Sequence, residues 1–232
     1  MQNGDIAIKN RRVKVDFMSK NNEISISVIR RLPRYYRFLG ELLKVGVERI
    51  SSKELASMLK LTASQIRQDF NCFGEFGQQG YGYNVSKLHH EISKILGFDN
   101  VQDVILIGAG NLGKAILSYT DFEARGFRLI GVFDKDPNII DCCIHGYKIL
   151  NIDNLELFCA KQHPTAAILC VPKISSEKLV KQLVAHNVKG FWNFSHYDPS
   201  FDYPNVVSEN VHLSDSLMTF SYKLNHLLSS SK

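Results

Sequence analysis

Three glycines and one acid have the spacing that binds a dinucleotide. Gly108, Gly110 and Gly113 follow an apolar run, and Asp134 stands 21 residues after Gly113, at the end of the next apolar run. In this context the first glycine permits a tight turn, the second lets the backbone approach a pyrophosphate, and the third lets helix and strand pack closely. Asp134 can accept hydrogen bonds from ribose hydroxyls, which favours NAD or NADH over a 2′-phosphorylated cofactor. A structural glycine turn is the alternative. The loop residues expected to bind the cofactor are Gly108, Ala109, Gly110, Asn111, Leu112 and Gly113.

A second group of polar residues lies on a predicted helix that runs into a glycine-rich hairpin. Thr62 is a helix-start signal, and Ile66 and Phe70 have the i, i+4 spacing of an inward face. The polar side chains left outside can hydrogen-bond to base edges or phosphates. A reading helix with a β-wing is therefore predicted, although a hairpin that only closes a core would have the same glycines. The residues expected to contact DNA are Ser64, Gln65, Arg67, Gln68, Asn71, Gln78, Gln79 and Gly80.

Charge and composition agree with two different partners. The net charge is +7 through Gly97 and −2 from Phe98 onward, so a polyanion is expected to bind the first part of the chain. The five cysteines have no CxxC spacing, and neither a disulfide framework nor a metal site is expected. No apolar run approaches the ~20 residues that span a bilayer, and no signal peptide is evident, so we expect a cytoplasmic protein with no membrane partner.

The sequence lacks the features expected of an enzyme. Only 119 residues follow Gly113, and most of them are needed to complete a nucleotide-binding sheet. A dehydrogenase also needs a catalytic acid or base near the nicotinamide, and the histidines lie in separate segments. We expect no catalytic residues.

The pattern of elements predicts an α/β chain. Helix signals dominate its first part, and apolar runs alternating with amphipathic stretches from Val101 indicate a Rossmann-like, doubly wound parallel sheet. The predicted organisation is a flexible basic arm over 1–22, a winged helix-turn-helix domain over 23–84, a linker helix over 85–100, a Rossmann domain over 101–213 and a C-terminal helix over 214–232.

Six motifs in this order resemble the Rex family of redox-sensing transcriptional repressors. The resemblance runs from about Ser27 to Leu228. The motifs are Arg31-Leu32-Pro33-Arg34-Tyr35-Tyr36-Arg37, Ser51-Ser52-Lys53-Glu54-Leu55-Ala56, the segment from Arg67 to Tyr83, Gly108-Ala109-Gly110-Asn111-Leu112-Gly113, Phe133-Asp134-Lys135-Asp136-Pro137 and Gly190-Phe191-Trp192-Asn193-Phe194.

The resemblance implies a homodimer that exchanges its C-terminal helices, reads a palindromic operator in double-stranded DNA and releases it when NADH binds. It also implies that Arg37 and Tyr119 connect the nicotinamide pocket to the DNA-binding domain. The family places an aspartate in the same network, where this chain has His212. A histidine does not offer Arg37 a permanent anionic partner.

Two alternatives to a standard redox-sensing repressor remain open at this point. In one, the protein resembles the family and binds DNA, but its NADH response is weakened or altered by His212. In the other, it is a small NAD-dependent oxidoreductase with a basic accessory domain.

Overall fold

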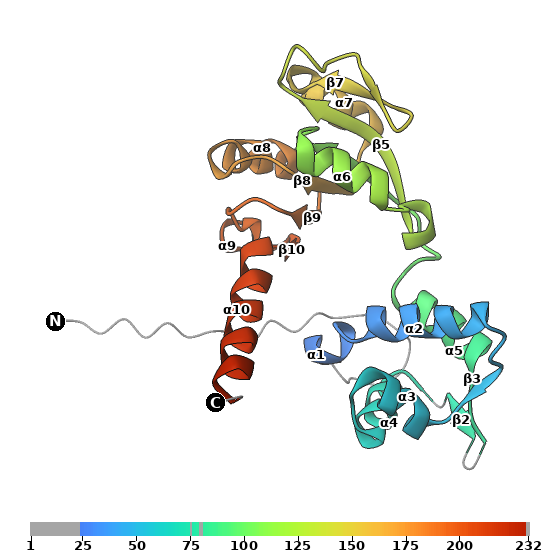
Figure 1. Cartoon of the computed structure of the whole chain (residues 1–232). Coiled ribbons are helices and arrows are strands. Elements are labelled where there is room, and N and C mark those ends of the chain that lie inside the picture. Colours follow the sequence, from blue (N-terminus) through green and yellow to red (C-terminus); the bar gives the residue numbers. More distant parts are fainter. Residues whose placement is uncertain (1–23, 75, 79–80, 231–232) are drawn as a thin grey trace. The chain divides into compact units, whose positions relative to one another are not determined.

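The computed structural model describes residues 24–74, 76–78 and 81–230 (Figure 1). It consists of two compact units, Met1–Asp99 and Asn100–Lys232, and each is described by itself. The arm expected over 1–22 lies outside the described residues.

The first unit is built on helices whose ends follow from the sequence. They are α1 (Ile26–Ile29), α2 (Leu32–Lys44), α3 (Ser52–Leu59), α4 (Ala63–Asn71) and α5 (Val85–Ile95). Pro33 lies in the first turn of α2, where its missing N–H breaks no helical bond. Ser51 and Glu54 form a capping box at α3, and the Thr62 hydroxyl accepts from the amide of Gln65 at the start of α4.

Helix α5 is part of the first unit, whereas the sequence suggested a separate linker over 85–100. Val85, Leu88 and Ile92 are buried in the same core as Tyr35 and Phe70. Helix α5 therefore stabilises the first unit, and it ends well before residue 100.

The predicted wing belongs to a small antiparallel sheet with the order β1-β3-β2, made of β1 (Arg49–Ile50), β2 (Gly77–Gln78) and β3 (Gly82–Asn84). Gly82 has φ +68°, and a Cβ there would lie 2.6 Å from the Ile50 carbonyl oxygen. Only glycine fits at position 82, where the backbone of β3 approaches that of β1.

The second unit is a seven-stranded sheet with the order β10-β9-β8-β4-β5-β7-β6. Neighbouring strands are parallel except β6 and β7. The chain first builds outward from β4 through β5 to β7 and then restarts on the other side of β4, which is the doubly wound arrangement expected. The strands are β4 (Gln102–Ile107), β5 (Phe127–Asp134), β6 (Cys143–Ile144), β7 (Tyr147–Asn151), β8 (Ala166–Leu169), β9 (Gly190–Asn193) and β10 (Val207–Asn210).

Helices cover both faces of this sheet. Val104 and Leu106 pack with residues of α6 (Asn111–Tyr119). Ile105 and Ile107 point to the opposite face and pack with α7 (Leu155–Gln162) and α8 (Lys173–Ala185). The strands thus read as continuous apolar runs because both of their faces are buried. Short helical turns occur at Glu123–Arg125, Ile152–Asn154 and α9 (Pro199–Asp202).

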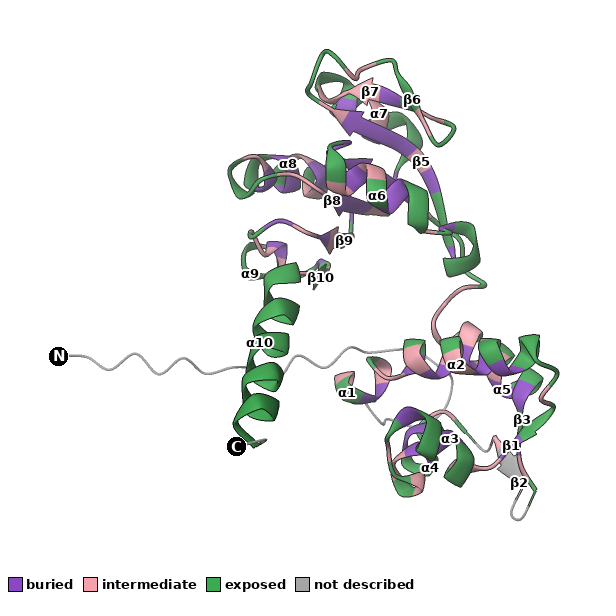
Figure 2. Ribbon diagram, in the orientation of Figure 1, coloured by how far each residue is buried: buried purple, intermediate pink, exposed green. Residues whose placement is uncertain are grey.

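The last helix, α10 (Leu213–Ser230), is different because none of its residues is buried. Figure 2 shows it exposed along its whole length. Leu217 is 67% exposed and Phe220 59%, although both lie on the side that is apolar in sequence. Within the described part of the chain, no helix combines the length and apolar character that a membrane span requires.

Candidate functional site

The glycine-rich loop joins β4 to α6 where the sheet order reverses. Gly108 has φ +98°, and a Cβ there would lie 2.5 Å from the Cys170 carbonyl oxygen. A Cβ on Gly113 would lie 2.0 Å from the Gly108 carbonyl oxygen. A Cβ on Gly110 would meet no heavy atom within 4 Å. The first and third glycines are thus required by the protein's own packing, while Gly110 borders open space, as expected for the approach of a ligand.

The start of α6 is suited to an anion. Gly110 is its N-cap residue and offers no side-chain acceptor, so the amides of the first turn have no side-chain cap. Such amides, together with the helix dipole, bind phosphate. Ala109 is buried, Leu112 packs in the core under the loop, and Asn111 is exposed.

Asp134 lies beside this loop, as the spacing predicts. At the end of β5, its Oδ2 accepts from the backbone N–H of Ala109 at 2.6 Å. Its Oδ1 accepts from the amides of Lys135 at 2.7 Å and Asp136 at 3.0 Å. The carboxylate is therefore held at the loop with an acceptor position to spare. Tyr119, the last residue of α6, is 89% exposed.

Most of the predicted DNA-contacting residues on α4 face solvent. Ser64, Arg67, Gln68 and Asn71 are exposed. Arg67 Nη1 donates to the Ser52 hydroxyl at 3.1 Å, which places the guanidinium at the start of α3. Gln78 belongs to β2, and Gln79 and Gly80 lie outside the described residues.

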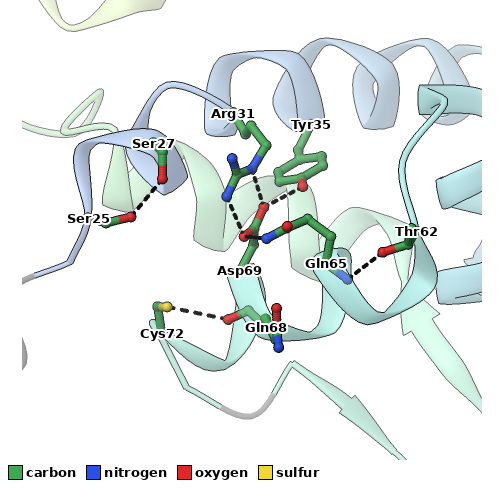
Figure 3. Close-up of polar contacts among 9 residues, drawn as sticks. All are labelled: Ser25, Ser27, Arg31, Tyr35, Thr62, Gln65, Gln68, Asp69 and Cys72. Carbon is green, nitrogen blue, oxygen red and sulfur yellow. Dashed lines mark hydrogen bonds and ion pairs between the residues drawn. The ribbon is translucent and has the colours of Figure 1, made fainter.

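Gln65 differs from these residues because its side chain turns inward. It is half-buried, and its Nε2 donates to Asp69 Oδ1 at 2.8 Å (Figure 3). Asp69 is fully buried and also accepts from Arg31 Nε at 2.6 Å, Arg31 Nη2 at 2.8 Å and the Tyr35 hydroxyl at 2.6 Å. Burial alone would raise the pKa of Asp69, but the hydrogen bonds from Arg31, Tyr35 and Gln65 outweigh it and lower the pKa below the usual value.

The cluster of Asp69, Arg31 and Tyr35 is not among the residues predicted from the sequence. One signal was available, since position 69 falls between Ile66 and Phe70 on the inward face of α4, where an acid requires a partner. A second signal is that Arg31 and Tyr35 have an i, i+4 spacing at the start of α2.

His212 lies between β10 and α10. Its ring stacks on that of His196, with centroids 5.1 Å apart and planes 8° apart. The Nδ1 atom is buried and has no hydrogen-bond partner among the described residues. Arg37, its expected partner, is exposed on α2 of the first unit.

A polar network fixes the strand ends beside this histidine pair. Asn193 is buried, and its amide nitrogen donates to the Tyr197 carbonyl oxygen at 2.6 Å and to Asn210 Oδ1 at 2.7 Å. Its Oδ1 accepts from the backbone N–H and the hydroxyl of Ser195. All four hydrogen-bonding positions of the Asn193 amide are used, which ties the end of β9 to that of β10.

Two family models match successive parts of the chain. The model described as putative DNA-binding protein N-terminus matches residues 23–71, which include α4. The model described as CoA binding domain matches residues 99–197, which include the glycine-rich loop. The two matches follow the division into two units.

Two relatives that match most of the chain carry the same name. The chain is 52% identical over 208 residues to the redox-sensing transcriptional repressor Rex of Clostridium botulinum, covering 90% of this chain and 99% of that protein. The protein of the same name from Caldanaerobacter subterraneus subsp. tengcongensis is 51% identical over 208 residues, with 90% and 92% covered.

Solved structures agree with these relatives. A structure of RSP in complex with β-NAD⁺ and operator DNA has a TM-score of 0.82 at 48% identity, covering 91% of this chain and 97% of that one. RSP in complex with β-NADH has a TM-score of 0.81 at 45% identity, covering 91% and 100%. RSP is described as a Rex-family repressor. On this identity, coverage and structural agreement, the chain belongs to the Rex family of redox-sensing transcriptional repressors.

Proposed function

We propose that this protein is a transcriptional repressor that binds an operator in double-stranded DNA and releases it when NADH occupies the second unit. The observation that carries the proposal is the presence, in one chain, of an exposed polar row on α4 and a glycine-rich loop with open space at Gly110. NAD and NADH are the ligands of the loop, with Asp134 on the ribose. The bound complexes of RSP with β-NAD⁺, β-NADH and operator DNA support both kinds of partner. The oxidoreductase alternative is set aside, because the relatives are named as transcriptional repressors.

The proposal includes a homodimer on a palindromic operator. Helix α10 leaves Leu217, Phe220, Leu224 and Leu227 at least 41% exposed on one side, and an apolar helix side of this size favours a partner helix. A second copy would supply it and would place a second α4 on the other half of the operator. The cytoplasm is the proposed location.

The decisive experiment measures operator affinity of the full chain at fixed salt while the NADH/NAD ratio is varied. Affinity is expected to fall as NADH replaces NAD. If affinity stays constant across the ratio while both nucleotides bind, the redox-sensing part of the proposal is overturned.

A paired variant separates the two halves of the proposed function. Arg67→Ala should weaken DNA binding, because it removes a cation from the exposed side of α4. It should leave NADH affinity intact, since Arg67 belongs to the first unit. Equal loss of both affinities would indicate unfolding instead.

His212 favours a second candidate, a DNA-binding repressor with a weakened NADH response. Its Nδ1 has no hydrogen-bond partner among the described residues, and its ring stacks on that of His196. An imidazole also lacks the negative charge of an aspartate. We expect His212→Asp to enlarge the difference in operator affinity between NADH and NAD, because aspartate restores the permanent negative charge that the family resemblance implies at this position. His163→Asp, at the exposed end of α7, is the matched control and should change nothing. An unchanged response in His212→Asp counts against this candidate.

A further inference from the structure

The reading helix α4 has a buried carboxylate with no acceptor position left. Each oxygen of Asp69 accepts two hydrogen bonds, Oδ2 from Arg31 Nε and Tyr35 and Oδ1 from Arg31 Nη2 and Gln65, all between 2.6 and 2.8 Å. A carboxylate offers about four acceptor positions. The donors come from α4 itself and from the start of α2 (Figure 3). Asp69 therefore joins these two helices through bonds that depend on how α4 is rotated about its axis.

This arrangement fixes the amide of Gln65. An ionised carboxylate only accepts hydrogen bonds, so Gln65 must present its NH₂ group to Asp69, and its side chain runs along the helix by one turn. Swinging it outward to a base edge would break that bond. The loss would leave a buried carboxylate oxygen with one partner fewer, which is unfavourable in a low-dielectric site.

The exposed positions of α4 form a separate row. Ser64, Gln68 and Asn71 follow the i, i+4, i+7 spacing that puts side chains on one face of a helix, and all three are exposed. Gln65 lies at the border between this row and the buried positions Ile66 and Asp69.

We infer that Asp69 sets the rotation of α4 through its bonds to Arg31 and Tyr35, that Gln65 is a positioning residue that holds the Asp69 carboxylate in place for those bonds, and that Ser64, Gln68 and Asn71 read the base pairs. This inference rests on the proposed DNA-binding function and goes beyond it, because it gives Gln65 and Asp69 a different role from that of Ser64, Gln68 and Asn71. Removing a base-reading contact relaxes discrimination at one base pair. Removing a positioning contact weakens binding to all duplexes alike, because the whole row shifts.

The test uses the same substitution at both glutamines of α4. Full-length wild-type protein first selects duplexes from a random-sequence pool, and the affinity for the best duplex and all its single-base-pair variants is then measured at one salt concentration. Gln65→Met and Gln68→Met keep the side-chain length and remove the amide. Gln65→Met should lower the affinity for every duplex by a similar factor and keep their ranking. Gln68→Met should flatten discrimination at one base pair in each half-site, by about tenfold.

Several outcomes decide the matter. Loss of discrimination at a single base pair in Gln65→Met overturns the inference, and so does an unchanged affinity for all duplexes. The duplex affinities of the Gln65→Met variant are measured far below the melting temperature of that variant. If Gln65 contributed only to stability, these affinities would equal the wild-type values. NADH affinity should be unchanged in both variants. If the wild-type protein selects no common sequence, the proposed function fails instead, which distinguishes the two failures.

Discussion

At the scale of single residues, the glycines of the loop differ in what they do for the protein. Gly113 has no room for a side chain, because a Cβ would lie 2.0 Å from the Gly108 carbonyl oxygen, whereas Gly110 has open space and φ −70°. We expect Gly113→Ala to lower the free energy of unfolding by more than ~2 kcal/mol. Gly110→Val should cost at most ~1 kcal/mol as a poorer N-cap, yet abolish NADH binding by filling the space beside the backbone.

Thermal melting and NADH titration of the two glycine variants test this contrast. Arg67→Ala serves as the control that retains NADH binding, since it lies in the other unit. Normal NADH affinity in Gly110→Val would show that the open space is not the pyrophosphate site.

Asp69 makes the stability of the first unit depend on pH. Its pKa in the folded protein is below the usual value, so its contribution is complete above the unfolded-state pKa of ~3.9 and is lost as pH falls through the folded-state pKa. We expect Asp69→Asn to lower the free energy of unfolding by ~3 kcal/mol at pH 7, the lower end for a buried pair, because the Arg31 side chain is 25% exposed. Urea unfolding between pH 7 and pH 3 gives the free energy of unfolding of the first unit in the wild-type protein and in Asp69→Asn. The difference between them should shrink below pH 4, and a constant difference would contradict the assigned role of the carboxylate.

At the scale of elements, α10 is the helix whose apolar side chains are most exposed among the described residues. Replacing Leu217 and Phe220 by Glu should prevent self-association, because both side chains are more than half exposed on the apolar side of the helix. Sedimentation velocity should show a dimer for the wild-type chain and a monomer for the double variant. His226→Glu lies on the opposite side of α10 and should remain dimeric. A monomeric wild-type chain at micromolar concentration would refute the dimer.

The elements that the sequence predicted are those with strong local patterns. The strands around Val104, Leu129, Ala167 and Phe191 were predicted because both faces are buried, which produces continuous apolar runs. Strand β10 was missed because its residues, Val207–Asn210, are half-exposed and mostly polar. Helix α5 was predicted as a helix, but its membership of the first core depends on contacts with distant residues that no local pattern records.

At the scale of the whole molecule, charge separates the two binding functions. The chain carries +7 through Gly97 and −2 beyond it. Raising NaCl from ~50 to ~200 mM should therefore weaken operator binding by about tenfold or more, through the loss of counterion release. NADH binding in the second unit should change far less. Fluorescence anisotropy of labelled duplex and NADH titration, both in the same buffers, provide the comparison, and an equal salt dependence would contradict this division.

The sequence predicted more detail of the candidate site in the second unit than in the first. The geometry of the glycine-rich loop could be predicted because Gly108, Gly110 and Gly113 act through local backbone conformation, and Asp134 follows at a fixed interval. Helix α4 could be located, but the inward turn of the Gln65 side chain could not, because it depends on a buried acid. The partners of that acid stand 38 and 34 residues away along the chain. Pairings over such distances arise only from the packed helices.

The open space beside Gly110 bears on how such a regulator can change over generations. A side chain at position 108 or 113 would clash with the protein's own backbone, so selection for a folded chain alone would remove such a substitution. A Cβ at Gly110 meets no neighbouring atom, so a substitution there costs little stability and is opposed mainly by selection for the ligand. A descendant freed from the need to sense its nucleotide could thus lose that sense in one step, while it continued to fold and to occupy DNA.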